Sequence, residues 1–287
     1  MLGAIIGDMV GSIYDFKPIK TKDFKIYDYN MRMTDDSLLT IAVAKVLMNH
    51  YPIIYKKKNL EIIKEELRYE FVKTWESNKG AGFGAMFYLW CQKAKYKKVE
   101  PYNSLGNGCA MRISPVGWIA NTEKHLKILS KAVTEITHNH PDSIKGAEAI
   151  SLCIYLSLHN YSKEEIRKRM IEEYYPEIQN FIFWDLVKNY EFSEICSKSV
   201  PQAIYCFLIS NSLEDAIRNC IAIGGDCDTT AAMAGAIAEA YYQKDKLSPF
   251  EDKFLYFLID KEVEDLIKKF HKTIGLSLIH ISEPTRP

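Results

Sequence analysis

Apolar residues recur along this chain mainly three and four residues apart, the spacing of one helix face, whereas the alternation typical of strands is sparse. Only the segment 24–29, FKIYDY, alternates weakly, and it could form a short edge strand or a loop. No linker rich in Pro, Gly or Ser and no low-complexity tract interrupts the pattern. The sequence therefore predicts one compact all-α domain. The predicted helices span residues 2–14, 37–50, 59–75, 84–94, 123–134, 143–158, 163–173, 179–189, 200–208, 213–221, 230–242 and 250–271.

Two of these helices are apolar on every side, so we expect them inside the protein. Residues 38–48, LLTIAVAKVLM, carry a single charge, and residues 231–238, AAMAGAIA, carry none. Near the start of the chain, Gly3, Gly7 and Gly11 follow one another in steps of four residues. On a helix they form a stripe without side chains, along which another backbone can approach closely. We therefore expect the first helix to be internal as well.

Composition and charge narrow the class of protein. The 37 Lys and Arg residues balance the 37 Asp and Glu residues, which argues against a protein held on nucleic acid mainly by phosphate neutralisation. No run of about 18 apolar residues predicts a membrane span, and the first residues, MLGAIIGDMVGS, lack the basic start of a signal peptide. The seven cysteines contain no C-x-x-C pair, which suits reduced thiols better than disulfides or a zinc site. We expect a cytoplasmic monomer.

The end of the chain does not match the rest of the domain. Its last eleven residues, SLIHISEPTRP, resemble the translated cloning or sequencing-adapter tails found at the ends of some gene models. An ordinary disordered C-terminus is the alternative. We therefore predict one domain over residues 1–274 and a C-terminal tail over residues 275–287.

Paired carboxylates stand directly before the two apolar helices. One carboxylate would be enough to cap each helix and to complement its dipole. Four carboxylates in a shared space would not all ionise near neutral pH without compensation, and a divalent cation supplies it. Oxygen ligands favour Mg²⁺, Mn²⁺ or Ca²⁺ over zinc. Helix capping stays open as the alternative. The two clusters consist of Thr34, Asp35 and Asp36 before the first helix, and of Asp226, Asp228 and Thr229 before the second.

A third acidic pair lies near the N-terminus. Asp8 and Asp15 are seven residues apart, so they share a helix face, roughly 10 Å apart along the axis, if the helix continues that far. Equally, Asp15 could mark the end of the helix.

Two further segments carry candidate binding residues. In GNGCAMRISPVGW, residues 106–118, two glycines flank Asn107 and a lone Arg112 follows. Glycines let a backbone approach a ligand closely, and backbone N–H groups in such a loop can hold phosphate, although a tight turn explains the glycines equally well. In THNHPDS, residues 137–143, the side chains of His138, His140 and Asp142 could form half of a metal site, or they could cap a helix or line a loop.

Taken together and in chain order, these segments resemble the ADP-ribosylglycohydrolase family, which includes the dinitrogenase reductase-activating glycohydrolases. The resemblance covers nearly all of residues 1–242, and its motifs are specific as a set rather than one by one. It comprises GAIIGDMVGS at 3–12, MTDDS at 33–37, GNGCAMRISPVGW at 106–118, THNHP at 137–141 and GGDCDT at 224–229.

The resemblance implies a single compact domain of orthogonal helices with a central metal-binding cleft that holds two Mg²⁺ or Mn²⁺ ions. It also implies ADP-ribose bound beside the ions and His138 near the adenosine side or the ribose. The metal ligands it implies are Thr34, Asp35, Asp36, Asp226, Asp228 and Thr229. The substrate-binding residues it implies are Gly106, Asn107, Gly108, Met111, Arg112 and His138.

Three positions depart from the family pattern. Asp15 stands where many members carry Glu, which puts the reach of that carboxylate in doubt. Cys227 stands where Ser is common between the two aspartates, and Gln243 replaces a frequent Gly after the last motif.

The implied reaction is hydrolysis at the anomeric carbon of ADP-ribose through an oxocarbenium-like transition state. Asp36 and Asp15 are our candidates for the acid and base, without a division of roles. The implied partner is an ADP-ribosylated protein or a small-molecule conjugate, with arginine favoured as acceptor from the resemblance alone. Three alternatives stay open: a metal-dependent phosphohydrolase that uses THNHPD, a binding or structural protein on the same fold, and hydrolysis of free or nucleic-acid-linked ADP-ribose.

Overall fold

The computed structural model describes residues 1–287 except residues 16, 53, 55–56, 243–247, 258 and 276–287. Within the described part, every regular element is a helix, which confirms the predicted all-α fold. The β-type pairing there is one isolated bridge between Gly106 and Ile195. The α-helices are α1 Leu2–Gly11, α2 Asp35–His50, α3 Lys57–Ser77, α4 Ala85–Ala94, α5 Ser114–Ile119, α6 Glu123–Thr134, α7 Pro141–Leu158, α8 Lys163–Glu173, α9 Phe183–Asn189, α10 Cys196–Leu208, α11 Leu213–Ile223, α12 Cys227–Tyr242, α13 Pro249–Phe257 and α14 Lys261–Thr273, and the 3₁₀ turns are η1 Asn107–Cys109 and η2 Pro176–Asn180.

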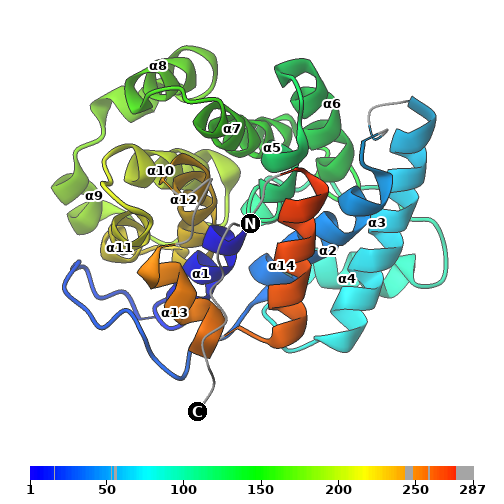
Figure 1. The fold of residues 1–287 in the computed structure, drawn as a ribbon, viewed down its shortest axis with the longest axis horizontal. Helices are drawn as coiled ribbons and strands as arrows, with labels where there is room; N and C mark the ends of the chain where they lie inside the picture. The colour runs from blue at the N-terminus through cyan, green and yellow to red at the C-terminus, as the bar shows by residue number, and fades with distance from the viewer. Residues whose placement is uncertain (16, 53, 55–56, 243–247, 258, 276–287) are drawn as a thin grey trace.

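Helix α1 lies near the middle of the molecule, with α10, α11 and α12 on one side and α2, α3 and α4 on the other (Figure 1). Its glycines face α12 along its whole length. A Cβ atom would lie 2.3 Å from the Gly235 oxygen if placed on Gly3, and 2.1 Å from the Ala231 oxygen if placed on Gly7. On Gly11 it would lie 2.3 Å from the Asp228 Cα atom. The glycine stripe therefore makes the predicted close approach, and α1 and α12 run antiparallel.

The two helices predicted to be internal are α2 and α12. Both are buried over most of their length, because small and aliphatic side chains cover every face. Their N-terminal ends, with the paired aspartates, meet the C-terminal end of α1. The fold thus brings together three segments that are far apart in the sequence.

Several predicted boundaries are wrong, each for a local reason. Helix α1 ends at Gly11 rather than residue 14, because the Ser12 hydroxyl donates to the Met9 carbonyl oxygen and competes with the helical pattern. The predicted helix 250–271 is divided into α13 and α14, because the Asp260 side chain accepts from the Glu262 N–H and caps a new helix.

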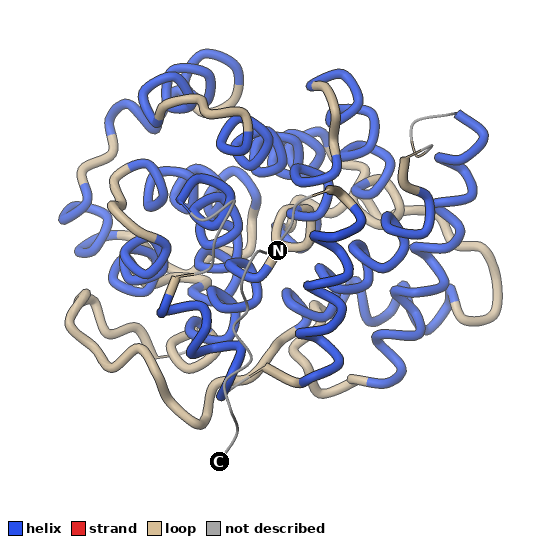
Figure 2. Tube along the Cα trace, in the orientation of Figure 1, coloured by secondary structure: helices blue, strands red, loops and turns tan. Residues whose placement is uncertain are grey.

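Other differences concern Pro and short elements. Helix α10 begins at Cys196, not at residue 200, and carries Pro201 in its interior. The predicted helix 179–189 begins only at Phe183, after the turn η2. The short helix α5 was not predicted, and the segment 24–29 forms a loop without strand pairing in its described residues (Figure 2). Gln243 and residues 276–287 of the predicted tail lie outside the described residues.

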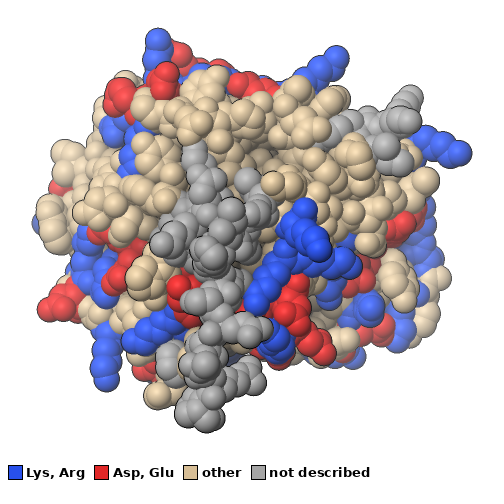
Figure 3. Space-filling view, in the orientation of Figure 1, with Lys and Arg blue, Asp and Glu red and all other residues tan. Residues whose placement is uncertain are grey.

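The surface agrees with the balanced composition. On the face shown in Figure 3, basic and acidic side chains lie next to one another, mainly along the rim and the lower half. No helix among the described residues is long and apolar enough to cross a membrane.

Candidate metal centre and active site

The N-terminal end of α2 is capped from two directions. Thr34 occupies the N-cap position, and its hydroxyl oxygen accepts from the Asp36 N–H at 3.3 Å. Asp8, from α1, accepts from the N–H groups of Thr34 at 2.9 Å and Ser37 at 3.1 Å, from the Thr34 hydroxyl at 2.6 Å and from the Ser37 hydroxyl. Thr34 and Asp8 therefore perform the capping, which leaves the carboxylates of Asp35 and Asp36 for another role.

The start of α12 is set by a glycine turn. Gly224 and Gly225 have φ angles of 73° and 82°, a left-handed conformation that side chains disfavour. The turn directs Asp226 toward the loop at residues 106–109, where its carboxylate accepts from the Asn107 side-chain amide at 2.7 Å. One turn into α12, the Thr229 hydroxyl donates to Asp36 Oδ2 at 3.5 Å. The starts of α2 and α12 are therefore in direct contact.

Four of the aspartates on these segments, with Asp15, form two groups around one shared residue. Carboxylate oxygens of Asp8, Asp36 and Asp228 lie within 4.8 Å of one another, and so do those of Asp15, Asp226 and Asp228. We call these the inner trio and the outer trio. Asp8 and Asp15 do not share a helix face, since α1 ends between them. Even so, each has a carboxylate oxygen within 4.8 Å of one of Asp228. Sequence reasoning noted Asp8 but did not include it in the metal site.

Burial and mutual repulsion raise the pKa values of these carboxyl groups. Burial and then the charge of Asp228 raise the pKa of Asp15 to about 7 and that of Asp35 to about 8. Burial and then Asp8 raise the pKa of Asp228 to about 6. The pKa values of Asp36 and Asp226 are also raised well above the ordinary range, by burial first and by Asp228 second. The protein alone does not supply enough positive charge to keep this centre ionised.

The donor set fits a hard divalent cation. Asp36 Oδ1 and Asp15 Oδ1 are buried and have no hydrogen-bond partner among the described residues. Such oxygens are costly inside a protein unless something binds them. Asp8 differs, because four donors already occupy its two oxygens, about as many as a carboxylate can accept. We therefore regard Asp8 as the residue that holds Thr34 and α2 in place beside the metal ligands.

The loop at residues 106–109 adjoins this centre through one side chain. The Asn107 amide nitrogen donates to Asp226 and also to the Ser199 hydroxyl at 3.1 Å. Gly106 and Gly108 lie against the imidazole of His138, where an added Cβ atom would be 3.7 Å and 3.5 Å from Nε2. The structure thus brings Asn107, both glycines and His138 together beside the outer trio.

Arg112 lies in the core rather than on a binding surface. It is only 1% exposed, its guanidinium lies 4.4 Å from the centre of the Phe71 ring, and it donates to the Thr137 hydroxyl at 2.6 Å. That hydroxyl is 2.7 Å from His138 Nδ1, so Arg112 reaches His138 through Thr137. Burial and then the Arg112 charge hold the pKa of His138 well below its usual range, which keeps the imidazole neutral. Met111 is buried beside α2, where its carbonyl oxygen accepts from the Thr40 hydroxyl at 3.4 Å.

The histidine segment does not join either trio. His140 caps α7, because its Nδ1 atom accepts from the Asp142 N–H at 3.1 Å. Among the described residues, the groups close enough to hold a metal ion contain neither His138 nor His140. For His140, the geometry matches helix capping.

A cavity of about 640 Å³ opens beside the outer trio, with Asp15 and Gly225 in its wall. Its other walls come from the loop after α1 and from the connection between α9 and α10, including Lys20, Tyr190 and Phe192. A ligand in this cavity would touch the acidic centre.

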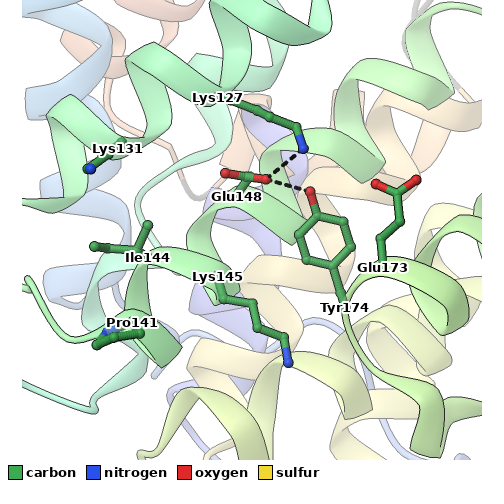
Figure 4. A pocket seen from close by; sticks show the side chains of 8 residues that line it. All are labelled: Lys127, Lys131, Pro141, Ile144, Lys145, Glu148, Glu173 and Tyr174. Carbon is green, nitrogen blue, oxygen red and sulfur yellow. Dashed lines mark hydrogen bonds and ion pairs between the residues drawn. The ribbon is translucent and has the colours of Figure 1, made fainter.

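A second hollow, of about 420 Å³, lies over α6, α7 and the end of α8 and contains several charged side chains (Figure 4). Its central carboxylate already has partners: Glu148 pairs with Lys127 at 3.1 Å and accepts from the Tyr174 hydroxyl at 2.6 Å (Figure 4). The carboxylate of Glu148 therefore has its partners within the protein, unlike the carboxylates of the acidic centre.

Comparison with known proteins agrees with this geometry. The sequence profile of a family described as ADP-ribosylglycohydrolase matches residues 1–275. ADP-ribosylhydrolase ARH3 of Mus musculus is 24% identical over 313 residues, covering 84% of this chain and 82% of its own. An uncharacterised protein of Archaeoglobus fulgidus is 22% identical and covers 93% of this chain and 88% of its own. A solved structure titled "ADP-ribosylglycohydrolase-related protein complex" has the same fold, with a TM-score of 0.71 at 17% identity over 95% of this chain and 97% of that one.

Proposed function

The chain belongs to the ADP-ribosylglycohydrolase family and is a glycohydrolase, and from that premise we propose that its acidic centre hydrolyses the bond between ADP-ribose and an acceptor. The observation that carries the proposal is the pair of trios that share Asp228 at the meeting point of α1, α2 and α12. Two of their buried oxygens have no partner among the described residues, so the centre is built to bind something.

We propose that two Mg²⁺ or Mn²⁺ ions complete the centre. The residues that would hold them are Thr34, Asp35, Asp36, Asp226, Asp228 and Thr229. Such ions lower the pKa of bound water, orient sugar hydroxyls and neutralise the carboxylates. Support comes from the raised pKa values of the aspartates, because burial and the charges of neighbouring aspartates disfavour their ionised forms and a cation would offset both.

Two carboxyl groups are suited to proton transfer. Asp15 borders the cavity of about 640 Å³, and its pKa of about 7 in the metal-free centre is close to the ideal for a group that must both hold and release a proton. Asp36 lies deeper, 3% exposed, with Oδ1 free to take a proton. We propose that these two residues exchange protons with the attacking water and the departing acceptor.

The loop at residues 106–109 is the proposed binding surface for ADP-ribose. Gly106 and Gly108 have no side chains to obstruct a phosphate or ribose, and the Asn107 amide is already fixed by Asp226 and Ser199. His138 would meet the adenosine side as a neutral donor or acceptor. Met111 and Arg112 support this surface from beneath, and Arg112 acts on it through Thr137.

The proposed substrate is an ADP-ribosylated protein side chain or a small-molecule ADP-ribose conjugate, and we favour arginine as the acceptor. The relatives named ADP-ribosylhydrolase support ADP-ribose as the released group. We further propose a cytoplasmic monomer. The seven free, buried cysteines support a reducing compartment, and light scattering of the purified chain tests the monomer.

The decisive experiment offers the purified chain ADP-ribosylated arginine, ADP-ribosylated serine and a phosphomonoester, with Mg²⁺ present. The proposal requires free ADP-ribose with its pyrophosphate intact. Release of AMP or phosphate would instead identify a phosphohydrolase, and retention of ADP-ribose without turnover would identify a binding protein. Either result would overturn the glycosidic reaction even if the metal site proved correct.

A further inference from the structure

Asp15 belongs to the outer trio although no helix carries it. It follows the end of α1 at Gly11, in the long loop that leads to α2 (Figure 2). The backbone N–H of Cys227, at the start of α12, partly offsets the rise in the pKa of Asp15, and carboxylate oxygens of Asp15, Asp226 and Asp228 lie within 4.8 Å of one another. A carboxylate on a loop of this length needs further attachment to stay within ligand distance of Asp226 and Asp228.

Lys20, five residues after Asp15, supplies that attachment. Its ammonium group donates to the carbonyl oxygen of Ile223 at 2.6 Å and to that of Tyr190 at 2.9 Å. Ile223 is the last residue of α11, so its carbonyl oxygen has no partner within the helix and carries the negative end of the helix dipole. One side chain therefore joins the loop after α1 to two segments that are 170 and 203 residues away in the sequence.

The backbone at Lys20 shows that this position is held by its surroundings. Its φ angle is 54°, in the left-handed region that residues with a side chain rarely adopt. Such a conformation is strained and persists only where contacts impose it. The two hydrogen bonds of the ammonium group are contacts of that kind.

The same ammonium group also confines the turn that directs Asp226. An added Cβ atom on Gly224 would lie 3.0 Å from Lys20 Nζ, and one on Gly225 would lie 2.4 Å from a ring carbon of Tyr190. The turn is therefore enclosed between Lys20 and Tyr190. The carbonyl oxygen of Tyr190 is itself one of the two acceptors of Lys20, so the three segments form one connected unit.

We propose that Lys20 is the positioning residue of the outer trio: it fixes Asp15 relative to Asp226 and Asp228 by joining the α1–α2 loop to the end of α11 and to Tyr190. The inference rests on the proposed function in treating these three aspartates as one working group. Lys20 acts through the backbone and does not contact the reacting atoms, although it also lines the cavity of about 640 Å³.

Three variants separate this role from the alternatives. Lys20→Gly removes the ammonium group and accommodates the positive φ without strain, whereas Lys20→Arg keeps the charge and the donors. Lys188→Gln is the matched control, because Lys188 lines the same cavity from the last turn of α9. Mn²⁺ is titrated calorimetrically into each metal-free protein, and circular dichroism verifies that each is folded.

We expect Lys20→Gly to bind Mn²⁺ about tenfold more weakly, because the turn that directs the proposed ligand Asp226 loses the ammonium group that confines it. A tenfold loss is the lower end of that seen when groups that orient metal ligands are removed. Lys20→Arg should recover most of the affinity, and Lys188→Gln should match the wild type. With substrate, Lys20→Gly should lower kcat more than it raises KM.

Two results would overturn the proposal. Unchanged Mn²⁺ affinity in Lys20→Gly, even with a lower melting temperature, would make Lys20 a structural tie with no effect on the trio. A raised KM with unchanged kcat and Mn²⁺ affinity would make it a substrate contact. The titration needs no substrate, so a wild-type chain that releases no ADP-ribose would end the proposed function while the role of Lys20 is still decided.

Discussion

The two ends of the antiparallel pair α1 and α12 both bury carboxylates, but they compensate them differently. At one end, Glu239 of α12 is 1% exposed, and it accepts from the N–H groups of Leu2 at 3.1 Å and Gly3 at 2.8 Å. It also pairs with the α-amino group of Met1. At the other end, Asp228 stands among four further aspartates in the inner and outer trios.

The difference lies in where the compensation comes from. Glu239 uses the N-terminal N–H groups of α1, which have no partners within the helix, so the protein itself supplies its positive partner. Beside it, Glu251 has its pKa raised to about 8, by burial first and by Glu239 second, and so is mostly neutral near pH 7. At the acidic centre, neither hydrogen-bond donors of the protein nor raised pKa values compensate all the carboxylates. Two buried aspartate oxygens there have no partner among the described residues. Glu251 Oε1 is also buried without a partner among the described residues, so an unpartnered oxygen does not by itself indicate a ligand. The acidic centre differs because five aspartates crowd together there, around Asp228.

Removal of divalent metal should produce the largest effect, and only at the acidic centre. We expect EDTA to abolish ADP-ribose release and Mg²⁺ or Mn²⁺ to restore it. Metal at about 100 times its Kd should stabilise the fold by about 2.7 kcal/mol, because it binds only the folded state. Activity assays and thermal melts, with metal content verified, measure both effects. Equal activity and equal melting temperatures with and without EDTA would show that the acidic centre, like the Glu239 end, does not depend on a metal ion.

Substitution of the shared aspartate should come next. We expect Asp228→Asn, and to a similar extent Asp35→Asn, to lose roughly two orders of magnitude in activity and to bind Mn²⁺ more weakly, because removing a metal ligand costs at least as much as removing its support. The metal-free variants should melt at or above the wild-type temperature, since one repulsive charge is gone. A variant that keeps full activity and Mn²⁺ affinity would exclude its residue from the site.

The opposite end should respond in the opposite sense. Glu239→Gln removes a charge that three donors share, and we expect it to destabilise the protein by about 1–3 kcal/mol. Its Mn²⁺ affinity should equal that of the wild type, because Glu239 lies at the far end of α12. Urea unfolding in EDTA and calorimetric titration measure the two quantities. A large loss of Mn²⁺ affinity would show that the two ends are coupled.

The last prediction concerns how the stability of the metal-free protein depends on pH. Folding raises the pKa of Asp228 from 3.8 to about 6, that of Asp15 to about 7 and that of Asp35 to about 8. The folded metal-free protein thus holds protons more tightly than the unfolded chain. Its stability from these groups is complete below about pH 3.8 and is lost as pH rises toward 8.

Unfolding in EDTA across pH 4 to 8 tests this expectation, and Mn²⁺ should remove most of the slope. Asp35→Asn serves as the control, since it should lower the slope over the whole range and remove most of the slope between about pH 7 and 8, where of these three groups mainly Asp35 still holds a proton. A metal-free protein whose stability rises over this range would contradict the expectation.

Residue spacing along the chain was enough to predict the all-α fold and to single out the paired aspartates. Helical spacing and apolar helices gave α2 and α12 as core elements, and the glycine stripe indicated the close contact of α1. These features depend on residues within a few turns of one another, so they are visible in a single segment. The paired aspartates were visible for the same reason, since each pair belongs to one helix start.

How these segments combine depends on packing between distant parts of the chain. In the folded protein, Asp8 accepts hydrogen bonds at the start of α2, and Asp15 lies in a loop as part of the outer trio. Arg112 is buried against Phe71, and Lys20 donates to the carbonyl oxygen of Ile223. Each of these depends on partners brought together by folding, and their hydrogen bonds and charges act across many residues of intervening chain. A local pattern shows which groups are available, but packing decides which of them are already satisfied and which still require a ligand.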